Sequence, residues 1–314
     1  MPEQLLEPKD SVKHLPRQRL DIALSVCISD AQSVCDAVRE IFLSRFPGQE
    51  AEFAILERVF TDIDHLYAGS YPGYFGCDTD YHDMRHILDV TLAATRLYDG
   101  YEKIHGGTDK ALGIERVQLG IVCALFHDIG YIRHRNDSKH AHGAEYTKIH
   151  VTRGTHFLAK YLPLLGKSDW IPRAKPLLHY TGYEKTVHLK DSLDHQLGCL
   201  LGTADLIAQM SDRAYLERCR DFLYTEFKIG NVAPPSSNGN QGFESPIALL
   251  DQTPDFIRNT IAKRLDGLFG SVYHYAAEHF GGANLYMDGI EKNCRFLEGL
   301  LEERKLHLLN RQTR

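Results

Sequence analysis

The chain has 314 residues, of which 43% are hydrophobic, and its formal net charge is −6. This length permits one large domain or two ordinary ones, and the mild negative charge excludes a strongly basic protein that gathers nucleic acid or anionic lipid through its overall field. Seven scattered cysteines without a C-x-x-C pair exclude a disulfide framework and a zinc ribbon.

The amino terminus lacks the apolar block of a secretory signal, and no apolar run reaches the length of a membrane span. We therefore expect a cytoplasmic protein with no membrane contact. Apolar side chains recur at helical spacing in segment after segment, whereas strand patterns are few, which predicts an all-α fold. The expected helices cover residues 17–45, 50–67, 81–100, 112–128, 141–164, 172–180, 192–229, 255–280 and 284–308.

The order of these elements predicts three parts around one linker. Residues 68–230 form a helical bundle that carries the chemistry, and residues 1–67 form a helical extension before it. Residues 231–254 contain the sequence NVAPPSSNGNQGFESP, whose composition indicates a linker or loop. The helices within 255–314 are expected to pack on the core, either as scaffold or as the surface of a homodimer.

Histidine is the residue type that stands out. Of the 17 histidines, twelve lie between His82 and His195, so chemistry is expected in that segment. His127 and Asp128 follow directly on the apolar run 119–126, and a buried carboxylate is costly unless it is paired or bound to a metal. Either a cation takes one nitrogen and one oxygen ligand here, or the helix ends at a solvated Asp128.

Further imidazoles and a carboxylate recur around this pair. His82 and His86 are four residues apart, which places both on one helix face. His150 is followed one turn later by Gly154, a spacing that permits a neighbouring helix to pack closely against the turn. Two other candidate ligands follow in apolar surroundings, namely His179 and Asp205.

Nitrogen and carboxylate oxygen ligands together suit Mn, Fe, Zn, Co or Ni better than calcium. The six candidate ligands exceed what one ion with open positions uses. We therefore expect two divalent transition-metal ions bridged by Asp128. The ligands expected in this binuclear centre are His86, His127, Asp128, His150, His179 and Asp205.

These motifs resemble the signature of the HD-domain superfamily of metal-dependent phosphohydrolases. YHDMRHILDV resembles the opening motif of the cyclic nucleotide phosphodiesterases, and HVTRG, LLH and ADLIAQMSDRAY resemble later motifs of bacterial HD-type phosphodiesterases. The resemblance covers about residues 75–220 and implies an HD-type helical bundle. It also implies that His86, His127, Asp128 and Asp205 are core ligands, that His150 and His179 are the added ligands of binuclear members, and that His82 is the general acid.

The activity implied is hydrolysis of a phosphodiester or nucleotide-like phosphate by metal-activated water, with Asp128 and His82 as catalytic residues. Two departures prevent transfer of a substrate. Tyr180 and the residues after it replace the G-Y-P run of the HD-GYP branch, and Tyr131 stands where animal cyclic nucleotide phosphodiesterases carry a histidine. The expected partner is a small phosphate-bearing molecule, such as a nucleotide, and not a nucleic-acid polymer.

Three residues are given supporting roles. Arg213 and Lys185 are candidates for binding the substrate phosphate, although Arg213 suits a structural salt bridge equally well. Asp89 is expected to accept the other N–H of a ligand histidine. Two alternatives stay open: a di-iron oxygenase of the inositol oxygenase-like branch, which uses the same ligand order, and a regulatory HD module without activity.

Overall fold

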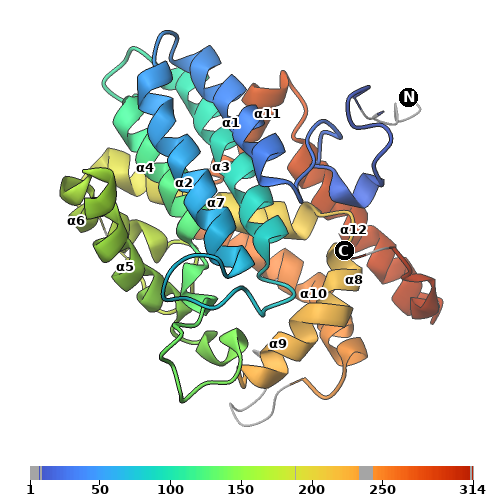
Figure 1. The fold of residues 1–314 in the computed structure, drawn as a ribbon. Helices are drawn as coiled ribbons and strands as arrows, with labels where there is room; N and C mark the ends of the chain where they lie inside the picture. The colour runs from blue at the N-terminus through green and yellow to red at the C-terminus, as the bar shows by residue number, and fades with distance from the viewer. Residues whose placement is uncertain (1–6, 8, 188, 233–242, 312, 314) are drawn as a thin grey trace.

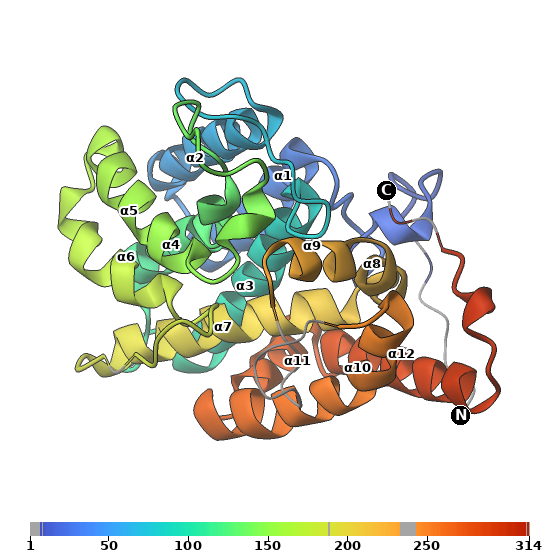
Figure 2. The same cartoon turned by 90° about the horizontal axis from the view of Figure 1, so that it is seen from below.

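The computed structural model describes residues 7, 9–187, 189–232, 243–311 and 313. The described residues are helical or irregular and contain only the isolated bridges Leu20–Cys27 and Tyr74–His134 in place of strands. This arrangement confirms the predicted all-α fold (Figures 1 and 2). In the described part of the chain, no helix combines the length and apolar character that a membrane crossing requires.

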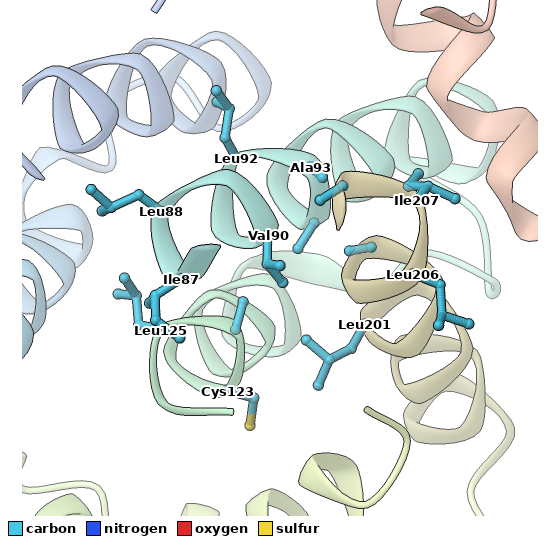
Figure 3. Close-up of a cluster of buried hydrophobic side chains, with 14 of the residues drawn as sticks. Ile87, Leu88, Val90, Leu92, Ala93, Cys123, Leu125, Leu201, Leu206 and Ile207 are labelled. Carbon is cyan, nitrogen blue, oxygen red and sulfur yellow. The ribbon is translucent and has the colours of Figure 1, made fainter. Parts of the chain in front are cut away.

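The core is built around α3 (Met84–His105), whose residues 85–102 are all buried. It packs against α1 (Ala31–Arg45), α4 (Gly113–Phe126) and α7 (Ser192–Ser211), while α2 (Glu50–Ala68) covers α4. Figure 3 shows apolar side chains of α3, α4 and α7 meeting, with Val90 of α3 lying between the other two helices. A helix buried on all sides is a rigid base for the polar groups at its end.

The remaining helices surround this base. On one side lie α5 (His150–Tyr161) and α6 (Ile171–Leu178), and α7 is followed by α8 (Tyr215–Arg218), the π-helical η6 (Cys219–Leu223) and α9 (Tyr224–Ile229). A C-terminal layer beneath α7 (Figure 2) contains α10 (Pro246–Thr260), the π-helical η7 (Ile261–Leu268), α11 (Tyr275–Phe280) and α12 (Leu285–Glu302). Short 3₁₀ helices are η1 (Arg17–Arg19), η2 (Ile129–Tyr131), η3 (Gly143–Tyr146), η4 (Leu162–Leu165), η5 (Ser168–Trp170), η8 (Val272–His274) and η9 (Leu306–Leu308).

Both terminal segments share the core of the central bundle. The N-terminal α1 packs on α3, and the C-terminal α11 and α12 pack on α3 and α7. Buried apolar residues from Ile28 to Leu309 form one cluster. The last helices therefore pack on the core, and residues between Ile28 and Tyr67 are part of the same core.

The N-terminal helix begins later than the sequence predicts. Residues 17–30 form η1 and a loop around the fully buried Asp21, whose carboxylate accepts hydrogen bonds from the backbone N–H groups of Ser25 and Val26. The same carboxylate pairs with Arg96 of α3 at 2.5 Å. A local carboxylate that satisfies backbone donors competes with the helix, so α1 begins only after Asp30, its N-cap.

Three other predicted helices are shorter or shifted. Residues 141–149 do not join α5, which begins at His150, and the helix predicted over 192–229 is interrupted at Asp212. The helix α10 begins at Pro246, inside the predicted linker 231–254, because Ser245 caps its N-terminus by accepting from Ala248 N–H. Residues 233–242 of that linker lie outside the described part of the chain.

Candidate metal centre

The four residues predicted as core ligands converge from three helices. His86 lies in the first turn of α3, where Asp83 caps the helix by accepting from the His86 N–H at 3.0 Å. His127 and Asp128 follow the last residue of α4, and Asp205 lies in the middle of α7. All four are buried, and His86, His127 and Asp205 have the spacing of a possible metal site.

The nitrogen and oxygen atoms of this cluster face one another. His86 Nε2 lies 3.2 Å from His127 Nε2, and both nitrogens lie near Asp128 Oδ2, at 3.4 and 3.2 Å. Asp205 Oδ1 closes the group at 3.5 Å from His86 Nε2 and 3.8 Å from His127 Nε2. His86, His127 and Asp205 therefore form one compact group of possible ligands, and Asp128 Oδ2 lies beside its two imidazoles.

Two of the imidazoles are oriented by backbone carbonyls. His127 Nδ1 contacts the Ala124 carbonyl at 2.8 Å, and His150 Nδ1 contacts the Thr147 carbonyl at 2.7 Å. A carbonyl can only accept, so in each ring Nδ1 carries a proton and Nε2 is the nitrogen that faces the site. This is the tautomer in which a histidine ligates a metal through Nε2.

Asp128 is the residue that connects the two halves of the cluster. Its Oδ2 faces His86 and His127, is buried, and meets no hydrogen-bond donor in suitable geometry among the described residues. Its Oδ1 lies 3.4 Å from His150 Nε2. A buried carboxylate oxygen without a donor is costly, and a cation at that position would remove the cost. The two oxygens of Asp128 thus face different imidazoles, Oδ2 toward His86 and His127 and Oδ1 toward His150.

In the metal-free protein, bound protons neutralise part of the negative charge of the two aspartates. Burial disfavours the charged form of His86, but contacts with Asp128 and Asp205 outweigh it and raise the pKa of His86 to about 10. Burial likewise opposes the Asp128 carboxylate, but the charge of His127 and contacts with both imidazoles hold its pKa well below the usual range. His86 is therefore protonated at neutral pH until a metal replaces the proton.

Because contacts with Asp128 and Asp205 raise the pKa of His86 and His127, metal binding should release at least about one proton per chain at pH 7. Titration calorimetry with Mn²⁺ in two buffers of different ionisation enthalpy measures this number, and equal heats in both buffers would contradict it. Affinity should rise with pH up to about 10, where His86 loses its proton unaided. The same shift stabilises the metal-free fold below the ordinary imidazole pKa of 6.5, and this stabilisation is lost as the pH rises through about 10.

His150 lies on the Oδ1 side of Asp128, whereas among the described residues no hydrogen bond or ion pair joins His179 to either residue, and the three do not form a compact ligand group. His179 is the C-cap of α6, is buried, and has an Nδ1 atom that meets no hydrogen-bond partner in the described part of the chain. Burial lowers the pKa of both imidazoles. The pKa of His179 is lowered further by the charges of Lys185 and His150. Neutral imidazoles are the ligating form, so both side chains suit a second ion.

Close packing brings the helices of these two histidines together. A Cβ atom on Gly154 of α5 would lie 3.1 Å from Leu178 Cδ2 and 3.6 Å from the His127 carbonyl oxygen. The predicted use of Gly154 for close approach is therefore confirmed. Gly130 has the tighter contact, since a Cβ there would lie 1.8 Å from the His150 carbonyl oxygen.

His82 lies beside the cluster but not in the helix predicted for it. Because α3 begins at Met84, His82 precedes the helix, and its ring centroid lies 5.7 Å from that of His86. The ring of Tyr131 stacks on His82 at 4.6 Å and on His150 at 4.5 Å. The stack fixes His82 next to the proposed ligands.

Glu226 of α9 is a site residue that the sequence did not indicate. It is 2% exposed, its Oε2 lies 2.5 Å from His82 Nδ1, and its Oε1 accepts from the Tyr81 N–H at 2.6 Å. Because the Glu226 carboxylate accepts this hydrogen bond, Nδ1 of His82 carries the donated proton. Nε2 is then the ring nitrogen that remains for catalysis. The residue lies 144 positions from His82, in a segment with no distinguishing motif.

Asp89, which the sequence predicts to support a ligand histidine, has a different environment. Asp89 Oδ1 is buried without a hydrogen-bond partner, and burial and the charge of Asp212 raise the pKa of Asp89 to about 7. No contact with a ligand histidine is found for it among the described residues. Instead, Gln209 Nε2 donates to the Asp205 carboxylate at 3.3 Å and orients that ligand.

The two residues predicted to bind the substrate phosphate lie in different environments. The Arg213 guanidinium donates to the carbonyls of Asp21 at 2.8 Å and Ile22 at 2.7 Å, so it fastens the N-terminal loop. Its geometry is that of the structural alternative, with carbonyls in place of the expected carboxylate. Lys185 is exposed, and its charge acts on His179, so it lies at the edge of the site.

Comparison of the chain with family models, curated proteins and solved structures gives no match. Its function is therefore inferred from the residues and geometry of the cluster.

Proposed function

We propose that the protein is a binuclear metal-dependent phosphohydrolase of the HD superfamily, acting on a phosphodiester or nucleotide-like phosphate. The observation that carries this proposal is the position of Asp128, whose buried Oδ2 lacks a hydrogen-bond donor and faces His86 and His127 while its Oδ1 faces His150. The ordered motifs that resemble the superfamily fall on these same residues.

The chain offers a ligand set for each ion. His86, His127 and Asp205 would hold one ion together with Asp128 Oδ2. A second ion would take Asp128 Oδ1, His150 and His179. When bound, divalent ions of this kind supply an activated water for attack on phosphorus and neutralise charge on the phosphoryl oxygens.

His82 is suited to serve the leaving oxygen. Its Nδ1 contacts the buried Glu226 at 2.5 Å, which orients the ring and leaves Nε2 to donate a proton to the leaving oxygen. The side chain is 16% exposed, compared with 6% for His86, so it faces the accessible side of the cluster. A general acid beside a metal pair favours hydrolysis over an oxygenase reaction, in which it has no evident task.

His82→Ala should therefore slow hydrolysis according to the leaving group. For an alkyl phosphodiester, which needs a proton on the leaving oxygen, we expect a fall in kcat of about 10²–10⁴-fold. For p-nitrophenolate, which departs without a proton, the fall should be much smaller. Glu226→Gln should show the same pattern more weakly, because the amide oxygen still accepts from Nδ1 but lacks the charge. An equal loss with both leaving groups would contradict the acid role.

The activity itself is tested with metal-stripped protein that is refilled with Mn²⁺ and given bis-p-nitrophenyl phosphate. We expect hydrolysis that depends on the metal, and it would justify trials of cyclic and linear nucleotides. No hydrolysis by protein shown to hold two ions would contradict the proposal. Oxygen uptake by an iron-loaded sample would then support the di-iron oxygenase, and inactivity in both assays would support a regulatory module.

A further inference from the structure

The turn that follows His179 is packed against the helix that carries Asp205. The Tyr180 ring lies over Gly198 of α7, where an added Cβ would come within 2.6 Å of it. One turn later, a Cβ on Gly202 would lie 2.5 Å from the Tyr180 carbonyl oxygen. Since Tyr180 directly follows His179, this contact sets the position of His179 relative to α7, the helix that carries Asp205.

Arg264 of η7 holds the same turn from the C-terminal layer. Its Nη2 donates to the carbonyls of Tyr180 at 2.9 Å and Gly182 at 3.2 Å. Its guanidinium also lies over the Tyr183 ring at 4.1 Å. One side chain therefore contacts three of the four residues after His179, and it comes from a π-helix, a rare element that recurs at functional sites.

Glu184 fastens the far end of the turn to the helix of His150. Its carboxylate accepts from the N–H groups of Val151 at 2.8 Å and Thr152 at 3.1 Å, and from the Thr152 hydroxyl at 2.5 Å. These donors belong to the first turn of α5, which His150 begins. The segment from His179 to Glu184 thus connects both proposed ligands of the second ion.

We infer that Arg264 is a positioning residue for the second metal ion. By holding the Tyr180 and Gly182 carbonyls, it fixes the turn that follows His179 against α7, and with it the position from which His179 would reach the second ion. This inference rests on the proposed binuclear centre, and it gives the C-terminal layer a part in the site. The first ion, held by residues of α3, α4 and α7, does not depend on this turn.

The test is metal titration of the full-length Arg264→Ala and Arg264→Lys variants with Mn²⁺, beside thermal unfolding. The wild type should bind two ions. In Arg264→Ala, the Kd of the second ion should rise about 10- to 100-fold while that of the first is unchanged. Lysine keeps a hydrogen-bond donor but lacks the planar guanidinium, so Arg264→Lys should bind the second ion with an intermediate Kd. This variant provides the test if Arg264→Ala does not fold.

Arg258→Ala is the matched control, because Arg258 lies in the same C-terminal layer and pairs only with the exposed Asp255 and the half-buried Glu298 among its described ion-pair partners. It should bind both ions as the wild type does. Folded Arg264 variants that bind the second ion with wild-type affinity would overturn the role of Arg264 and leave the proposed binuclear centre intact. A wild type that binds fewer than two ions would contradict the binuclear centre, and the inference would fall with it.

Discussion

Replacing Asp128 with alanine should prevent the folded protein from holding two ions and should lower phosphodiester hydrolysis by at least about 10²-fold, since even residues that only support ligands cost 10–100-fold. The reason is that both carboxylate oxygens are used, Oδ2 toward His86 and His127 and Oδ1 toward His150. Metal content by mass spectrometry and turnover in Mn²⁺ are measured on the same preparation.

Asp99→Asn separates this effect from a general loss of stability. Asp99 is also a buried carboxylate of the core, but its partners are Arg45 at 2.8 Å, His279 at 2.7 Å and Lys103 at 3.3 Å, which belong to no proposed ligand set. Its replacement should lower the Tm and leave metal content unchanged. Full metal content and turnover in folded Asp128→Ala protein would remove the bridging role of Asp128.

Gly130→Ala should destabilise the protein by about 1–3 kcal/mol and weaken metal binding. The added Cβ would lie 1.8 Å from the His150 carbonyl oxygen and 2.6 Å from its carbonyl carbon, so the backbone of α5 must move. That movement displaces His150 from Asp128 Oδ1. Denaturant unfolding measures the stability, and Mn²⁺ titration should show a larger loss at the second ion than at the first.

Gly299→Ala is the comparison for this substitution. Gly299 lies within α12, and a Cβ there would meet no atom within 4 Å. Because alanine is the better helix residue, this variant should gain about 0.5–1 kcal/mol. If Gly130→Ala were as stable as Gly299→Ala and bound metal normally, the contact between η2 and α5 would not set the position of His150.

Much of the site could be predicted from the sequence because its residues carry strong local signals. His127 and Asp128 follow an apolar run, which indicates a buried carboxylate that needs a positively charged or hydrogen-bonding partner. Asp205 lies in an apolar helix and needs such a partner for the same reason. The structure brings both carboxylates to within 3.5 Å of His86 Nε2. The helical periodicity that predicts the all-α class is likewise a local property of each segment.

The supporting residues could not be predicted in the same way, because their roles depend on tertiary contacts. Glu226 resembles any acidic residue of an amphipathic helix until the fold places it beside His82. Asp89 has helical spacing from His86 but faces Arg85 and Asp212, and Arg213 meets backbone carbonyls that no side-chain pattern reveals. The loop around Asp21 replaced a predicted helix for a similar reason, since Arg96 comes from a distant segment.

The central claim is that Asp128 bridges two metal ions, and anomalous X-ray diffraction from crystals of Mn²⁺-loaded protein tests it most directly. The account predicts two anomalous peaks, one beside Asp128 Oδ2 near His86, His127 and Asp205, and one beside Asp128 Oδ1 near His150 and His179. A map with no peak at Asp128, or with a single ion that leaves Oδ1 uncoordinated, would contradict it.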